Sequence, residues 1–143
     1  MGRTARGVAI GAAVALLGAA GVVAGAGART PKPRAPRITH ITASVANKRA
    51  SITVTINSEN LASTYQLALL YRPPDCCRPG TKECCPPEVE VVSTGNLAAS
   101  STSRQIHESA KLREGNWSVR VRVEAKNSAG SSEKSRALKA SGR

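Results

Sequence analysis

Four cysteines are the residues of this chain best suited to chemistry, and all of them lie within ten consecutive positions. They form two adjacent pairs, Cys76-Cys77 and Cys84-Cys85, separated by six residues. An even number of closely spaced cysteines in an exported chain predicts disulfide bonds. The nested pairing (Cys76 with Cys85, Cys77 with Cys84) and the crossed pairing (Cys76 with Cys84, Cys77 with Cys85) are both open, whereas bonding neighbours requires strained rings.

Two other uses of these cysteines are alternatives to disulfides. Four thiolates could hold a structural zinc ion, although zinc sites favour two residues between paired cysteines rather than none. Free thiols could also be reactive, because Arg78 and Lys82 in the same segment favour the thiolate form. The segment is therefore predicted to be a disulfide-stapled loop, in which Arg78 and Lys82 are candidate contact residues for a partner.

Few other residues support catalysis. The chain has two histidines, His40 and His107, and a single aspartate, Asp75. It contains no nucleophile elbow, no zinc-protease motif and no phosphate-binding loop. His107 follows the apolar Ile106 in an alternating stretch, which predicts an exposed side chain. We expect a protein that is not an enzyme and that needs no cofactor.

A second candidate surface is basic. Arg120 and Arg122 alternate with valines, so we expect both on the exposed face of one strand. Such a face suits a partner protein or an anionic polymer at the cell surface, such as a sulfated polysaccharide, an acidic lipid or an acidic cell-wall polymer. The alternative is that these charges only protect strand edges from aggregation. More basic residues lie in the same half of the chain: Lys111, Arg113, Lys126, Lys134, Arg136 and Lys139.

The N-terminal segment, residues 1–28, is predicted to direct export. Arg3 and Arg6 precede an apolar stretch over 8–23, and the small residues Ala26-Gly27-Ala28 follow it. This order is typical of a secretory signal peptide cleaved after Ala28. The alternative is an uncleaved membrane anchor. Both place the remaining chain in the secreted state or on the extracellular face of the membrane, where nucleic acid is not an expected partner.

Half of the net positive charge lies in the segments that precede the predicted strands. Residues 29–37 hold three prolines and four basic residues and are predicted to form an extended linker. The whole chain has a net charge of +12, and leaving out the basic residues of 1–28 and 29–37 reduces it to +6. The rest is therefore mildly basic. Asn116-Trp117-Ser118 is also an N-glycosylation sequence, which matters only in a eukaryotic secretory pathway.

From residue 38 the apolar residues recur with a period of two, which predicts strands. We expect their apolar members to face a core, and Asn47-Lys48 to form a turn. Seven short strands with turns between them predict an all-β protein, a seven-stranded antiparallel sandwich, which we expect to be monomeric. The predicted strands cover 41–45, 50–56, 65–71, 88–92, 106–112, 117–125 and 135–140.

The stretch Leu112-Arg-Glu-Gly-Asn-Trp-Ser-Val-Arg-Val-Arg-Val-Glu-Ala-Lys-Asn-Ser-Ala-Gly-Ser-Ser132 resembles a fibronectin type III domain, and Tyr65-x-Leu-x-Leu-x-Tyr-Arg-Pro73 resembles the third strand of that family. The resemblance implies an immunoglobulin-like sandwich over 38–141. The chain departs from the family where Ile56 takes the place of a tryptophan. Trp117 also replaces the corner tyrosine, so an indole N–H would have to make the hydroxyl's hydrogen bond.

Members of that family are mostly binding modules and spacers. The resemblance therefore implies a non-catalytic binding or adhesion module at the cell surface. A thiol or metal-binding protein that uses the cysteines is one alternative, and a purely structural spacer is another.

Overall fold

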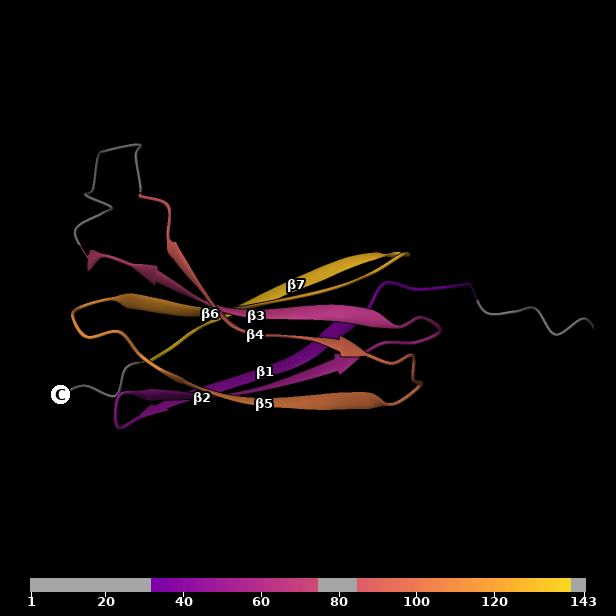
Figure 1. The fold of residues 1–143 in the computed structure, drawn as a ribbon, viewed down its shortest axis with the longest axis horizontal. Helices are drawn as coiled ribbons and strands as arrows, with labels where there is room; N and C mark the ends of the chain where they lie inside the picture. The colour runs from indigo at the N-terminus through magenta and orange to yellow at the C-terminus, as the bar shows by residue number, and fades with distance from the viewer. Residues whose placement is uncertain (1–31, 75–84, 140–143) are drawn as a thin grey trace, which may run out of the picture.

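The computed structural model describes residues 32–74 and 85–139, and these residues form seven β-strands (Figure 1). The expected all-β class is confirmed. The described residues leave out the predicted targeting segment, the candidate contact residues Arg78 and Lys82, and three of the cysteines (Cys76, Cys77 and Cys84). The strands are β1 (Arg37–Ala46), β2 (Arg49–Asn57), β3 (Ser63–Arg72), β4 (Glu88–Leu97), β5 (Ser103–Lys111), β6 (Ser118–Asn127) and β7 (Gly130–Ala137).

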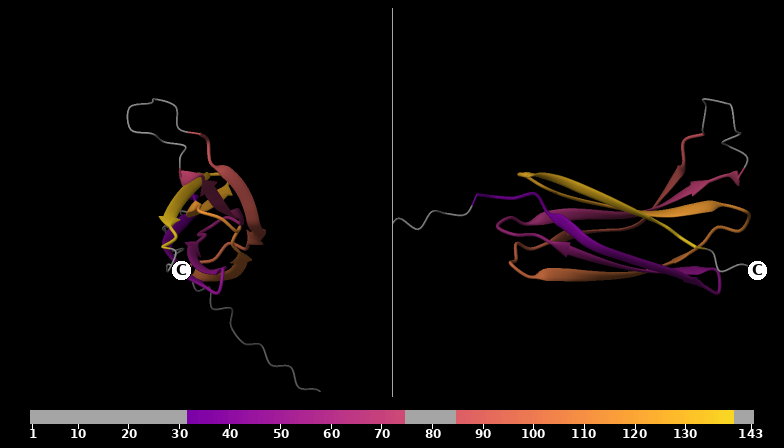
Figure 2. Two further views of the ribbon diagram at one scale, coloured as in Figure 1. Left: turned by 90° about the vertical axis from the view of Figure 1, so that its left-hand side faces the viewer. Right: turned by 180° about the vertical axis from the view of Figure 1, so that it is seen from behind.

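The strands make two antiparallel sheets, one with the order β1-β2-β5 and one with the order β4-β3-β6-β7. In both sheets the strands run roughly along the long axis of the molecule (Figures 1 and 2). This arrangement is compatible with a β-sandwich, because the apolar residues of the alternating stretches from both sheets form one buried cluster. Its members are Ile38, Ile41, Ala50, Ile52, Val54, Ile56, Leu67, Leu69, Tyr71, Leu97, Val121, Val123 and Ala125.

The predicted turn at Asn47-Lys48 joins β1 to β2. Both residues have positive φ angles, 51° and 60°, and Ala46 pairs with Arg49. A two-residue turn with this backbone matches the twist of the strands that it connects. The alternation over 50–56 is confirmed as well, since all four of its apolar members are buried.

The last strand begins earlier than expected, at Gly130 instead of Ser135, and ends at Ala137. Residues 130–134 are glycine, serines, glutamate and lysine, so no apolar alternation marks them as a strand. They form one because their backbone pairs with β6, from Asn127 opposite Gly130 onwards. Pairing between backbones, and not burial of side chains, decides the structure of this segment.

Two basic side chains of β7 form hydrogen bonds to the other sheet. Lys134 Nζ donates to the carbonyl oxygen of Thr39 at 3.0 Å, and Arg136 donates to that of Ile41 at 2.6 Å. Thr39 and Ile41 belong to β1, an edge strand of the other sheet. Lys134 and Arg136 thus satisfy carbonyls at an edge that another strand could otherwise approach, which removes both from the candidate binding surface.

The chain before β1 also packs against the sandwich. Pro36 is fully buried, and Asn127 Nδ2 donates to the carbonyl oxygen of Arg34 at 2.8 Å. Asn127 uses its other side-chain atom, Oδ1, to accept from the backbone of Ala129 and Gly130 in the β6–β7 turn. One asparagine therefore holds both the turn and the end of the basic, proline-rich segment.

Gly95 provides a stability prediction, because it lies under the ring of Tyr65. A Cβ at position 95 would meet Tyr65 Cε1 at 2.6 Å, closer than real Cβ contacts. We expect Gly95→Ala to lower the free energy of unfolding by about 1–3 kcal/mol, since the ring must move. Urea unfolding followed by circular dichroism measures this loss. In a Tyr65→Ala background the same change should cost much less, and an equal cost in both backgrounds would show that the ring is not the cause.

Candidate functional site

The outer face of the β4-β3-β6-β7 sheet carries the two arginines predicted from the sequence. Arg120 pairs with Leu70, and Arg122 pairs with Ala68, on neighbouring strands. Their valine neighbours Val121 and Val123 are fully buried, so the arginines point away from the core, as expected.

A groove of about 230 Å³ runs between these arginines. Arg72, the last residue of β3, contributes a third guanidinium, and Pro87, directly before β4, also lines the groove. Arg72 and Pro87 are also the residues on either side of the segment that holds the cysteines. The groove and the two ends of that segment therefore lie at the same end of the sheet. We call this hollow the basic groove; it is lined by Leu70, Arg72, Pro87, Ser118, Arg120, Arg122, Glu133 and Ser135.

The residues that line the basic groove carry more positive than negative charge. Three arginines face one carboxylate, that of Glu133. Among residues 32–74 and 85–139, the ion pairs do not include Arg72, Arg120 or Arg122. Residues two apart on one strand, such as Arg120 and Arg122, are about 7 Å apart, and so are diagonal neighbours on adjacent strands. The three arginines thus start from regularly spaced backbone positions, and the groove suits a ligand with repeated anionic groups.

Next to the groove, the outer face becomes apolar along β4. Val89 and Val91 lie opposite Leu70 and Ala68, and their side chains are 49% and 51% exposed. This differs from the expectation that they would face the core. The alternate residues, Glu88 and Glu90, lie on the inner side, which is possible because β4 is an edge strand and an arginine compensates both carboxylates.

That arginine is Arg113, from the segment between β5 and β6. It forms ion pairs with Glu88 and, at 3.1 Å, with Glu90, and its guanidinium lies 4.5 Å from the centre of the Tyr71 ring. The hydrogen bonds that Arg113 donates to the two carboxylates, above all to that of Glu88, raise the pKa of Arg113. Arg113 thereby links the start of β4 to the segment between β5 and β6. It is a structural residue and is not available to a ligand as Arg120 is.

Trp117 completes the same cluster. Its ring meets the buried Tyr71 ring edge-on, with centroids 5.9 Å apart at 81°. Its indole N–H donates to the carbonyl oxygen of Glu114 at 3.0 Å, so an indole does make the backbone hydrogen bond expected from the corner position. Gly115 permits this geometry, because its φ is +111° and a Cβ there would lie 3.1 Å from the indole nitrogen. Burial raises the pKa of the Tyr71 hydroxyl, and the backbone of Arg113 opposes this rise.

The remaining predicted residues are separate from the groove. Asn116 is exposed in the segment before β6. Of the four cysteines only Cys85 is described, and it has no free thiol, while the pairing of the four stays a prediction. His107 is exposed and lies 3.0 Å from the Thr53 hydroxyl. Within the described residues, no group of histidine, cysteine or acidic side chains is arranged to hold a metal.

Arg72 is the residue of the candidate site that the sequence analysis did not predict. It continues the outward series of β3 after Leu70, so its face follows from the period of two. The sequence pattern of β3 alone does not show that β6 is its neighbour. That neighbour brings Arg72 close to Arg120.

No family model matches the chain, and a search of the curated proteins finds no relative. The protein is therefore classed by its structure alone. It is all-β, with two antiparallel sheets, and one of the sheets carries the basic groove. In the described part of the chain, no helix is long and apolar enough to cross a membrane.

Proposed function

We propose that this protein is a non-catalytic binding module, secreted or held at the cell surface, that binds an anionic polysaccharide through the basic groove. The observation that carries the proposal is the convergence of three arginines beside the two ends of the cysteine-containing segment; none of the three forms an ion pair with another described residue. Guanidinium groups bind carboxylate and sulfate oxygens through paired, charge-assisted hydrogen bonds. A polymer that repeats such groups can engage all three arginines at once.

We also propose that the sandwich is of the fibronectin type III kind and follows an N-terminal signal peptide or anchor. The motif over 112–132 supports this, and so does the strand order. β4 joins the sheet of β3, β6 and β7, as an added strand does in variable-type immunoglobulin sandwiches. We propose further that the segment from Cys76 to Cys85 is closed by disulfide bonds, and that its Arg78 and Lys82 bind the same partner.

Calorimetric titration of the full chain with heparin, a sulfated polysaccharide, tests the proposed function. Release of counterions by three neutralised anionic groups predicts that the affinity falls about 40-fold between about 50 and 200 mM salt. Dextran, a neutral polysaccharide, is the control and should not bind. Absence of heparin binding, or binding with no dependence on salt, would contradict the proposal and favour a spacer.

A further inference from the structure

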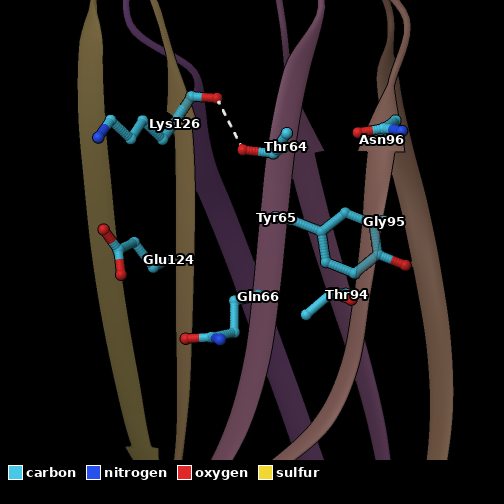
Figure 3. A pocket seen from close by; sticks show the side chains of 8 residues that line it. All are labelled: Thr64, Tyr65, Gln66, Thr94, Gly95, Asn96, Glu124 and Lys126. Carbon is cyan, nitrogen blue, oxygen red and sulfur yellow. Dashed lines mark hydrogen bonds between the residues drawn. The ribbon is translucent and has the colours of Figure 1, made fainter.

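A second hollow lies on the outer face of the same sheet, at the end opposite the basic groove. Its volume is about 550 Å³, more than twice that of the groove. The side chains that face it come from β3, β4 and β6 (Figure 3). We call it the polar hollow; besides Tyr65 and Gly95, six polar residues line it: Thr64, Gln66, Thr94, Asn96, Glu124 and Lys126.

Strand register arranges these six residues as a grid. Asn96, Thr64 and Lys126 are paired across β4, β3 and β6 and form one row. Thr94, Gln66 and Glu124 are paired across the same strands and form the next row. Neighbouring strands are about 4.8 Å apart, and rows of one face are about 7 Å apart. The grid is therefore about as large as one or two sugar rings.

The grid offers both kinds of hydrogen-bonding group. Gln66 and Asn96 each have a carboxamide that donates and accepts, Thr94 has a hydroxyl, and Glu124 accepts through its carboxylate. Within the part of the chain that the structure describes, the only side-chain hydrogen bond of the grid runs from Thr64 Oγ1 to the backbone of Lys126, at 3.4 Å. Sugar hydroxyls also donate and accept, so they match this mixture better than anionic groups do.

The position of the polar hollow favours a saccharide over a peptide. β3 and β6 are the two central strands of the sheet, so their backbones are already paired on both sides. A peptide cannot join the sheet there as an extra strand. The six side chains of the grid are polar, and Tyr65 adds an aromatic ring to the lining.

The two hollows lie along the same two strands. The outward residues run from the pair Thr64 and Lys126 to the pair Arg72 and Ser118, a distance of about 27 Å for eight residues of strand. Ala68, the smallest outward side chain of β3, lies between the hollows. A linear chain placed along β3 and β6 would meet the grid at one end and the arginines at the other.

We propose that the polar hollow is a saccharide subsite, which binds ring hydroxyl groups of the same linear acidic polysaccharide whose anionic groups occupy the basic groove. This inference rests on the proposed function. It predicts that affinity depends on chain length, because only a chain long enough to span the face reaches both subsites.

Calorimetry of the full chain with a heparin tetrasaccharide and a heparin decasaccharide tests the subsite. We expect the decasaccharide to bind about tenfold more tightly, as two or more added neutral hydrogen bonds imply. Gln66→Ala/Asn96→Ala should abolish this gain and leave the tetrasaccharide affinity unchanged. The matched control Thr42→Ala/Gln105→Ala, at exposed positions of the other sheet, should keep the gain.

The other outcomes are decisive as well. A gain that survives Gln66→Ala/Asn96→Ala would overturn the saccharide subsite and leave the proposed function intact. Failure of both oligosaccharides to bind the parent chain would overturn both proposals. Polyglutamate of matched length is the peptide comparison. If its affinity shows the same gain with length, lost in the same variant, the assignment of the hollow to a saccharide is wrong.

Discussion

Replacing Arg120 and Arg122 by glutamate is expected to weaken heparin binding about 100-fold or more. Each arginine is expected to make a charge-assisted hydrogen bond worth about 1.5–3 kcal/mol, and each glutamate adds repulsion. The slope of log affinity against log salt should fall by about two, because two fewer counterions are released. Both side chains point out of the sheet without ion pairs among the described residues, so the variant should fold normally.

The control for this experiment reverses two charges elsewhere. Arg104 and Lys111 are exposed on β5, in the other sheet, and have no ion pair within the described residues. Arg104→Glu/Lys111→Glu changes the net charge by the same amount, so it removes the same non-specific attraction. We expect it to weaken binding much less than the β6 variant. Equal losses in the two variants would mean that heparin responds to net charge and not to the groove.

Trp117→Ala should produce the largest loss of stability. The change removes the edge-on contact with Tyr71 and the hydrogen bond to Glu114. We expect the free energy of unfolding to fall by about 3 kcal/mol, the low end for aromatic truncation because the ring is half-buried. In a domain of this size the loss lowers Tm by about 10–20 °C. Thermal unfolding followed by far-ultraviolet circular dichroism measures it.

Trp117→Phe separates the two contributions of the indole. It keeps a ring against Tyr71 but removes the donor to Glu114, so it should cost about 1 kcal/mol for the lost hydrogen bond. A loss below about 0.5 kcal/mol for Trp117→Ala, the size usual for an exposed position, would show that the Arg113–Tyr71–Trp117 cluster does not hold this end of the sandwich.

Much of the fold could be predicted from the sequence because burial on one face leaves a period of two. Residues 50–56 show this best, since their four apolar side chains are all buried. β7 could be predicted only in part, because residues 130–134 form a strand through backbone pairing and bury no large side chain. For β4, the sequence predicts the alternation of apolar and polar residues correctly, but it predicts the wrong face to be buried. Arg113 compensates two carboxylates that point inward.

The candidate site could be predicted only where one strand defines it. Arg120 and Arg122 follow from the alternation of β6 alone. Arg72 and the polar hollow depend on which strands are neighbours and in what register, and no local pattern contains that information. Gln66 and Asn96 also resemble ordinary exposed residues until β4 and β6 are placed on either side of β3.

The central claim is tested most directly by mapping where a polyanion binds on the protein. Amide chemical shifts of the full chain, recorded by nuclear magnetic resonance during a heparin titration, report this residue by residue. We predict that the largest changes occur on β3 and β6, at Arg72, Arg120 and Arg122, and spread towards Gln66 as the chain is lengthened. Changes centred on the β1-β2-β5 sheet, with none at these arginines, would contradict the account.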